Sequence, residues 1–247
     1  MSAIPFNAYD VFAYLSSGFF VIASADLALP GNWVVNAKLS AIQGVVWIVV
    51  AYITGHVMAQ ISANLLEKGL VKHVLHAPED SLFAKPGGKL RGLFPGYFES
   101  MPREIRLLVL RRAKAEAGIR RVGRALFVYC DAKARKESAA ATHLTIFLGM
   151  YGFARNVCVA ALVSTGVFIV GIIGYDADLQ TTVFLACATF VVAGFLLYRY
   201  LKFLRVYALE VFTAYAALDP LPEPPQLPAP FSRFELGLRM ARRGPPA

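Results

Sequence analysis

The sequence has little charge and little cysteine for its length. Charged residues make up 17% of its 247 residues, whereas hydrophobic residues make up 57%. Because soluble domains rarely combine so little charge with so much apolar material, the composition favours a membrane protein. The three cysteines, Cys130, Cys158 and Cys187, form no even set with regular spacing. We therefore expect no disulfide framework.

Motifs that mark common catalytic sites are also missing. The sequence contains no G-x-S-x-G, no H-E-x-x-H, no CxxC pair and no Rossmann glycine fingerprint. His73 and His76 lie three positions apart, but no spacing completes a ligand set with Cys130 or His143. We therefore name no catalytic residue and expect neither a metal nor a cofactor.

What the chain does contain is four long apolar stretches, each with the length that a helix needs to cross a bilayer. They cover residues 11–29, 39–61, 156–175 and 181–198. Short connections join the first to the second and the third to the fourth. The pattern predicts an all-α integral membrane protein whose four transmembrane helices form two hairpins.

Basic residues are distributed unevenly along this pattern. The net charge is +9, yet the connection between the first two stretches carries only Lys38, and the connection between the last two carries no Lys or Arg. Residues 64–143 carry sixteen Lys and Arg against eight acids. Since basic residues gather on the cytoplasmic side, both termini and this segment are predicted to be cytoplasmic. We expect a multi-pass protein of a bacterial inner (plasma) membrane.

The second, third and fourth spans are expected to extend as helices into the cytoplasm. The chain as a whole divides into five predicted parts. Two helices, over residues 102–117 and 119–134, are predicted within the second part. The parts are an N-terminal transmembrane hairpin (1–63), a basic helical insertion (64–143), a C-terminal transmembrane hairpin with its helix extension (144–218), a proline-rich strap (219–230) and a basic amphipathic tail (231–247).

One polar stripe interrupts the second apolar stretch. Tyr52, His56, Gln60 and Asn64 recur every four residues and so share one face of a helix. His titrates near neutral pH, and ionisable groups at membrane depth are costly and often functional. We interpret the stripe as a candidate gate or sensor. The alternative is a set of interhelical hydrogen bonds that only holds the bundle together.

Charges near the predicted inner interface form a second group of candidates. Arg155 either extends its head group to lipid phosphates or pairs with an acid, for which Asp10 and Glu210 are the candidates. Other basic residues are candidates for binding anions or lipid headgroups. They are Arg111, Arg112, Arg120, Arg121, Arg124, Arg199, Lys202 and Arg205.

We rank the partners of these basic residues by chemistry. Anionic lipid headgroups come first because they are nearest, and a cytoplasmic protein or small ligand comes second. Nucleic acid is unlikely because no pattern of stacking aromatics accompanies the arginines. The strap followed by an amphipathic tail suits a homo-oligomer.

The function that follows is that of a non-enzymatic, oligomeric membrane protein, either a signal-responsive module or a channel-like, pore-type effector with a basic cytoplasmic cap. A setting in stress or phage defence is a hypothesis reached by elimination. The alternative is an inner-leaflet membrane enzyme or a small transporter that uses His56, Gln60 and Arg155.

Overall fold

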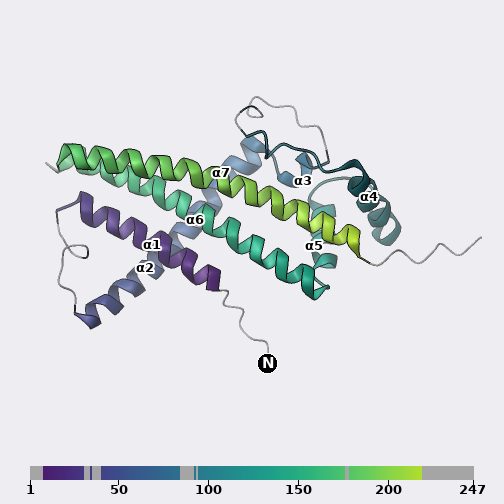
Figure 1. Cartoon of the computed structure of the whole chain (residues 1–247), viewed down its shortest axis with the longest axis horizontal. Helices are drawn as coiled ribbons and strands as arrows, with labels where there is room; N and C mark the ends of the chain where they lie inside the picture. Colours follow the sequence, from purple (N-terminus) through teal and green to yellow (C-terminus); the bar gives the residue numbers. More distant parts are fainter. Residues whose placement is uncertain are drawn as a thin grey trace, which may run out of the picture. The chain divides into compact units, whose positions relative to one another are not determined.

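The computed structural model describes residues 8–30, 34, 40–83, 92, 94–175 and 178–218, with the backbone alone at 8–10. All regular secondary structure among these residues is helical, without a strand (Figure 1). The helices are α1 (Ala8–Ala28), α2 (Ala41–Ser62), η1 (Ala63–Leu75), α3 (Pro78–Ser81), α4 (Arg103–Ala117), α5 (Arg124–Ala134), α6 (Ser138–Gly174) and α7 (Leu179–Ala217).

The all-α prediction is therefore confirmed for the described residues. Four helical stretches are long and apolar enough to cross a membrane: Val11–Ala28, Ala41–Ser81, Ser138–Gly174 and Leu179–Ala217. The last three continue well past the apolar stretches, as the periodicity predicts. Pairing of the spans as two membrane hairpins, and the side of the membrane on which the insertion lies, stay predictions.

The helix that follows α2 differs in its geometry from the expected α-helix. Segment η1 is π-helical, so its backbone hydrogen bonds close wider turns than those of an α-helix. Its buried side chains, Leu66, Val71 and Leu75, are spaced by five and then four residues. This spacing keeps one apolar face against the core although the turn has widened.

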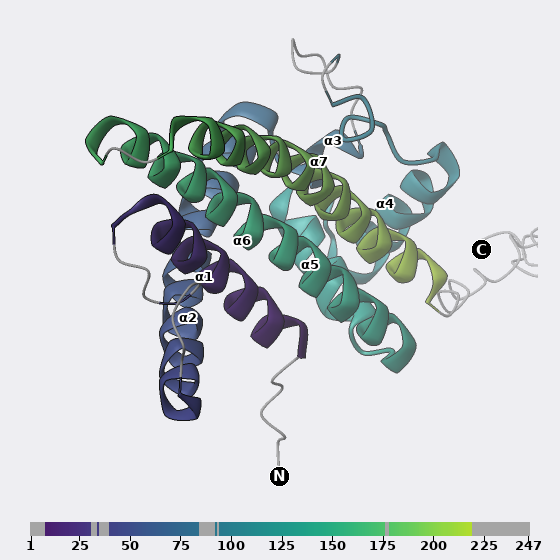
Figure 2. The same ribbon diagram turned by 60° about the vertical axis from the view of Figure 1, so that its left-hand side comes forward.

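Glycines bring α1 close to two neighbouring helices. A Cβ atom at Gly18 of α1 would lie 1.7 Å from the carbonyl oxygen of Ala51 in α2, and one at Gly55 would lie 1.8 Å from that of Tyr14. Gly171 of α6 faces Ala28 in the same manner, at 2.7 Å. Small residues allow such close approach of membrane helices. Figure 2 shows α1 between α2 and α6, in agreement with their contacts.

Helices α6 and α7 lie alongside one another in Figures 1 and 2. The Cys158 thiol contacts the Ala193 carbonyl oxygen at 3.3 Å, and the hydroxyls of Thr165 and Thr189 are 2.9 Å apart. A buried cluster joins both helices to η1 and includes Leu75, Tyr200 and other large side chains. The long helices and η1 therefore share one core.

Helix α5 packs on the C-terminal half of α7 through aromatic rings. Phe127 meets Phe212 edge-on at 5.8 Å between ring centroids and Tyr207 at 6.1 Å. Phe83 also meets Phe212 edge-on, with ring centroids 4.9 Å apart. The insertion thus has an apolar core of its own with α7.

One predicted helix begins later than expected. The sequence predicts a helix over residues 119–134, but α5 begins at Arg124. Gly118 ends α4 in the left-handed conformation with φ 68°, and Gly123 has φ 136°. Because side-chain-bearing residues rarely adopt these values, the two glycines keep the connection out of a helix.

Candidate functional site

A polar network joins the start of η1 to the middle of α6. The Ser62 hydroxyl donates to Asn156 Oδ1 at 2.7 Å, and Arg155 Nε donates to the same oxygen at 3.2 Å. Arg155 also forms an ion pair with Glu67. Ser62 and Asn156 are fully buried, so their hydrogen bonds satisfy groups that are costly to leave unpaired.

Arg155 is therefore a paired arginine, which was the sharper of the two sequence-based alternatives. Its partner is Glu67, whereas the sequence analysis named Asp10 and Glu210. The side chain of Asp10 lies outside the described residues. Glu210 lies half-buried on α7 and forms no ion pair with the described part of the chain. A signal for Glu67 was present, because Glu67 follows the second predicted span (39–61) and Arg155 directly precedes the third (156–175).

A cavity of about 740 Å³ adjoins this network, and Glu67 belongs to both. Its walls come from η1 and the turn after it, from α3 and α5, and from α6 and α7. Tyr151, Phe127, Leu148 and Leu204 supply much of the less polar lining. The charged residues that line the cavity are Glu67, Lys68, Lys72, Glu79, Asp80, Arg124 and Asp131. We call this cavity the charged cleft.

Three of the four acids in the charged cleft have a basic partner. Glu67 pairs with Arg155, and Glu79 lies 3.5 Å from Arg124, whose side chain is 78% exposed. Asp131 accepts from Arg135 at 2.9 Å. Among the described residues, neither Asp80 nor the two lysines form an ion pair. The charged cleft is therefore lined by paired carboxylates on η1, α3 and α5. The charges without an ion pair in the described part of the chain are Lys68 and Lys72 on η1 and Asp80 on α3.

The ion pair of Asp131 also fixes α5 to α7. The Tyr207 hydroxyl lies 3.1 Å from Asp131 Oδ1 and accepts from Arg135 at 2.9 Å. Partial burial acts to lower the pKa of Arg135, but its hydrogen bonds to Asp131 and Tyr207 outweigh burial and raise that pKa. The guanidinium therefore remains charged, and this wall of the charged cleft is held in place.

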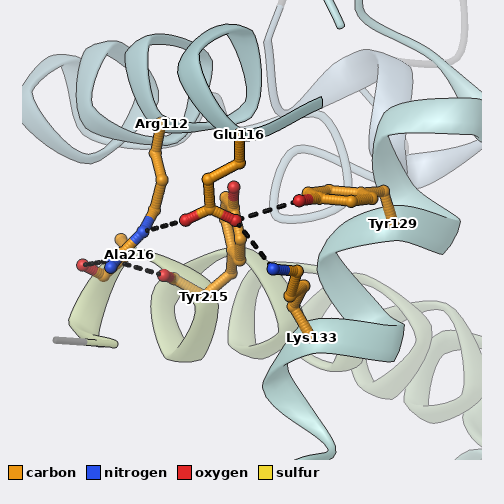
Figure 3. Close-up of polar contacts among 6 residues, drawn as sticks. All are labelled: Arg112, Glu116, Tyr129, Lys133, Tyr215 and Ala216. Atoms are coloured by element: carbon orange, nitrogen blue, oxygen red, sulfur yellow. Dashed lines mark hydrogen bonds and ion pairs between the residues drawn. The ribbon is translucent and has the colours of Figure 1, made fainter. Parts of the chain in front are cut away.

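A second network holds α4 and α5 to the end of α7, and Figure 3 shows its members. Arg112 is buried and donates to the carbonyls of Tyr215 and Ala216 at 3.2 and 3.3 Å. Its Nε donates to Glu116 at 2.9 Å. The last carbonyls of a helix lack partners within that helix, so Arg112 caps the C-terminal turn of α7.

Glu116 is the hub of this second network (Figure 3). The Tyr129 hydroxyl donates to it at 2.9 Å, and the Lys133 ammonium lies 3.2 Å away. Partial burial acts to raise the pKa of Glu116, but hydrogen bonds from Arg112, Tyr129 and Lys133 outweigh it and hold that pKa below its ordinary value. The carboxylate is thus ionised at neutral pH, joins α4 to α5 directly and is linked to α7 through Arg112.

The polar stripe on α2 divides between two environments. The His56 ring stacks on Tyr14 of α1, with centroids 4.1 Å apart, and meets Tyr52 edge-on at 4.6 Å. Gln60 and Asn64 are exposed, and Asn64 lies in η1. No hydrogen bond or ring contact among the described residues joins His56 to Gln60 or Arg155. Tyr14 was missed by the sequence analysis because only close helix packing brings it to His56.

The predicted anion- and lipid-binding residues occupy different positions. Arg112 is buried in the network of Figure 3, and Arg205 donates to the Glu99 carbonyl at 3.0 Å. The remaining members are exposed: Arg111, Arg120, Arg121, Arg124, Arg199 and Lys202. The Pro-rich strap at 219–230, the tail at 231–247 and Lys38 lie outside the described residues. Within the described ranges, no group of three His, Cys, Asp or Glu side chains is placed to hold a metal ion.

Comparisons with known proteins identify no relative. No family model matches the chain, and neither curated proteins nor solved structures give a match.

Proposed function

We propose that this chain is a non-enzymatic, oligomeric protein of a bacterial inner membrane, in which a cytoplasmic cap receives a signal and passes it to the membrane helices. One observation carries the proposal. The charged cleft is lined both by α3 and α5 of the insertion and by the continuations of three membrane-length helices. A molecule that fills the charged cleft would contact the cap and those helices at once.

A continuous set of contacts supports the transfer of such a signal. Glu67, which lines the charged cleft, pairs with Arg155, and Arg155 is connected through Asn156 to Ser62 at the end of α2. Further along α2, Gly55 lies directly against α1. Packed and hydrogen-bonded networks of this kind can couple distant sites, and mutation is the test of whether they do.

The exposed end of the polar stripe supports an oligomer. Gln60 and Asn64 are exposed among the apolar side chains Val57, Ile61 and Leu65. A polar side chain that faces lipid lacks hydrogen-bond partners, whereas a second copy of the helix could supply them. We therefore propose that these residues face another subunit and line a polar path in an assembled pore. Such a protein would suit a membrane-active response to stress or phage infection.

A membrane-potential assay tests this function. The full chain is expressed in bacteria with a potential-sensitive dye, during growth, osmotic shock and phage infection. We expect wild type to lower the potential under at least one of these conditions. Arg155→Ala, which breaks the network between the charged cleft and α2, should shift that response. Lys136→Ala removes an exposed charge outside the network and should behave as wild type.

Two outcomes would contradict the proposal. If the potential in wild type matched that of the empty vector under every condition, the pore would be excluded. If wild type responded but Arg155→Ala and Lys136→Ala both matched it, the network would not transmit the signal.

A further inference from the structure

Two lysine side chains line one wall of the charged cleft. Lys68 and Lys72 both line it from η1, and neither forms an ion pair among the described residues. Free lysines in a recess attract an anion, and lysine is a common ligand of phosphate. The neighbouring acid Glu67 is already paired with Arg155, so it does not neutralise them.

The other walls would not suit a bare or multiply charged anion. Asp80 lines the charged cleft without an ion-pair partner among the described residues, and Glu79 and Asp131 add two further carboxylates. Like charges at close range oppose the binding of a polyanion. A free carboxylate instead favours a hydroxyl or ammonium donor.

Apolar and aromatic side chains fill the space between these charges. Val71, Phe127, Leu148 and Leu204 line the charged cleft, and Tyr151 adds a ring beside them. The volume of about 740 Å³ lies in the range of sites that hold organic molecules of drug size. An occupant would therefore need an organic body as well as a charged group.

We propose that the charged cleft binds an organic phosphate ester. Its phosphate lies between Lys68 and Lys72, its body lies against Phe127 and Leu204, and its hydroxyl or ammonium group donates to Asp80. Two sources share this chemistry, a membrane phospholipid with its headgroup in the charged cleft and a soluble phosphate ester. The proposal rests on the proposed function, because the same cleft receives the signal.

Binding measurements on the full chain separate the two sources. In the first arm, the chain in detergent is titrated by calorimetry with adenosine 5′-monophosphate, inorganic phosphate and inorganic triphosphate. In the second arm, the chain is taken from nanodiscs of phosphatidylethanolamine and phosphatidylglycerol, and retained lipid is measured by native mass spectrometry. The test variant is K68Q/K72Q. The control R103Q/K114Q makes the same charge change on exposed positions of α4.

We expect binding in at least one arm, and a loss of at least tenfold in K68Q/K72Q with less than twofold change in R103Q/K114Q. Binding of the monophosphate would identify a soluble ligand, and retained phospholipid would identify the membrane. In the soluble case, inorganic phosphate and triphosphate should bind at least tenfold more weakly than the monophosphate. Asp80→Asn should weaken the organic ligand about threefold, because a hydroxyl or ammonium donor loses its acceptor, and should not weaken inorganic phosphate, because a repelling charge is removed.

Three outcomes of these measurements would contradict the proposal. The proposal is wrong if neither arm shows binding, if the two double variants behave alike, or if triphosphate binds most tightly. Its failure differs from that of the proposed function. A lack of binding together with an Arg155-dependent membrane potential would remove only the ligand class. Binding that depends on Lys68 and Lys72 without any change in potential would remove the proposed function and leave the site.

Discussion

Arg112 Nη1 of α4 donates to the carbonyl oxygen of Tyr215, 3.2 Å away and 103 positions later in the chain, at the end of α7. The guanidinium also lies over the Tyr215 ring, 5.6 Å from its centroid. One buried side chain thus supplies a hydrogen bond, a cation–π contact and, through Glu116, an ion pair. The insertion is fastened to α7 at this point.

Replacing Arg112 should release α4 from α7. Arg112→Ala removes the guanidinium that pairs with the Glu116 carboxylate and leaves two carbonyls of α7 without their hydrogen-bond donor. We expect this change to cost about 3 kcal/mol of local stability. Hydrogen exchange of the α4 and α5 amides, measured by mass spectrometry on the full chain, reports that loss. Lys114→Ala removes an exposed charge from the same helix and should change exchange by less than about 0.5 kcal/mol. Equal protection in the two variants would show that Arg112 does not fasten the insertion.

The same network predicts how α4 and α5 respond to acid. The folded pKa of Glu116 is lower than its ordinary value of 4.5, so its stabilising contribution is complete above 4.5 and is lost as the pH falls through the folded pKa. Glu116→Gln lacks this contribution at every pH. The difference in melting temperature between wild type and Glu116→Gln should therefore be largest near pH 7 and shrink below pH 4.5. A difference that stayed constant or grew in acid would show that the ionised Glu116 carboxylate does not stabilise α4 and α5.

Because α1 and α2 approach closely, adding a methyl group at either glycine of their contact should lower stability strongly. Gly18→Ala and Gly55→Ala would each place a Cβ within 2 Å of a carbonyl oxygen of the facing helix, so the helices must separate. We expect each variant to lose about 2 kcal/mol of stability, seen as a lower melting temperature in detergent. Gly44→Ala is the matched control on α2, because nothing lies within 4 Å of its added Cβ. Gly44→Ala should be neutral or slightly stabilising, since Ala favours a helix more than Gly does.

Sequence periodicity was sufficient for the features that depend on neighbouring residues. It predicted α4 and its end at Gly118, the four long helices, and the continuation of three of them beyond the apolar stretches. It placed the start of α5 five residues too early, because Gly123 needs a φ that no apolar pattern records. The π-helical geometry of η1 also went unpredicted, since its apolar spacing resembles that of an ordinary helix.

The candidate site depended on contacts between distant residues, and these were largely missed. Arg155 was recognised as a charge that needs a partner, but composition does not distinguish Glu67 from Glu210 as that partner. His56 was recognised as unusual, whereas its contact with Tyr14 follows from the glycine crossing of α1 and α2. The charged cleft needs side chains from η1, α5, α6 and α7 together, and no local pattern joins them.

Orientation in the membrane is also still a prediction, and single cysteines can test it. Lys114 is exposed on α4, and Gln180 is exposed near the connection between α6 and α7. Because basic residues gather in the insertion, a membrane-impermeant maleimide should label Lys114→Cys only in inside-out vesicles. Gln180→Cys should react only in right-side-out spheroplasts.

The native cysteines provide the background for this labelling. Cys130 and Cys158 are buried, and burial raises the pKa of the Cys130 thiol to about 12, so it stays protonated and unreactive near pH 7. Cys187 is exposed, and wild type measures its share of the signal. Labelling of Lys114→Cys in spheroplasts would place the insertion outside the cell. The charged cleft would then face the periplasm, and a cytoplasmic signal could not reach it.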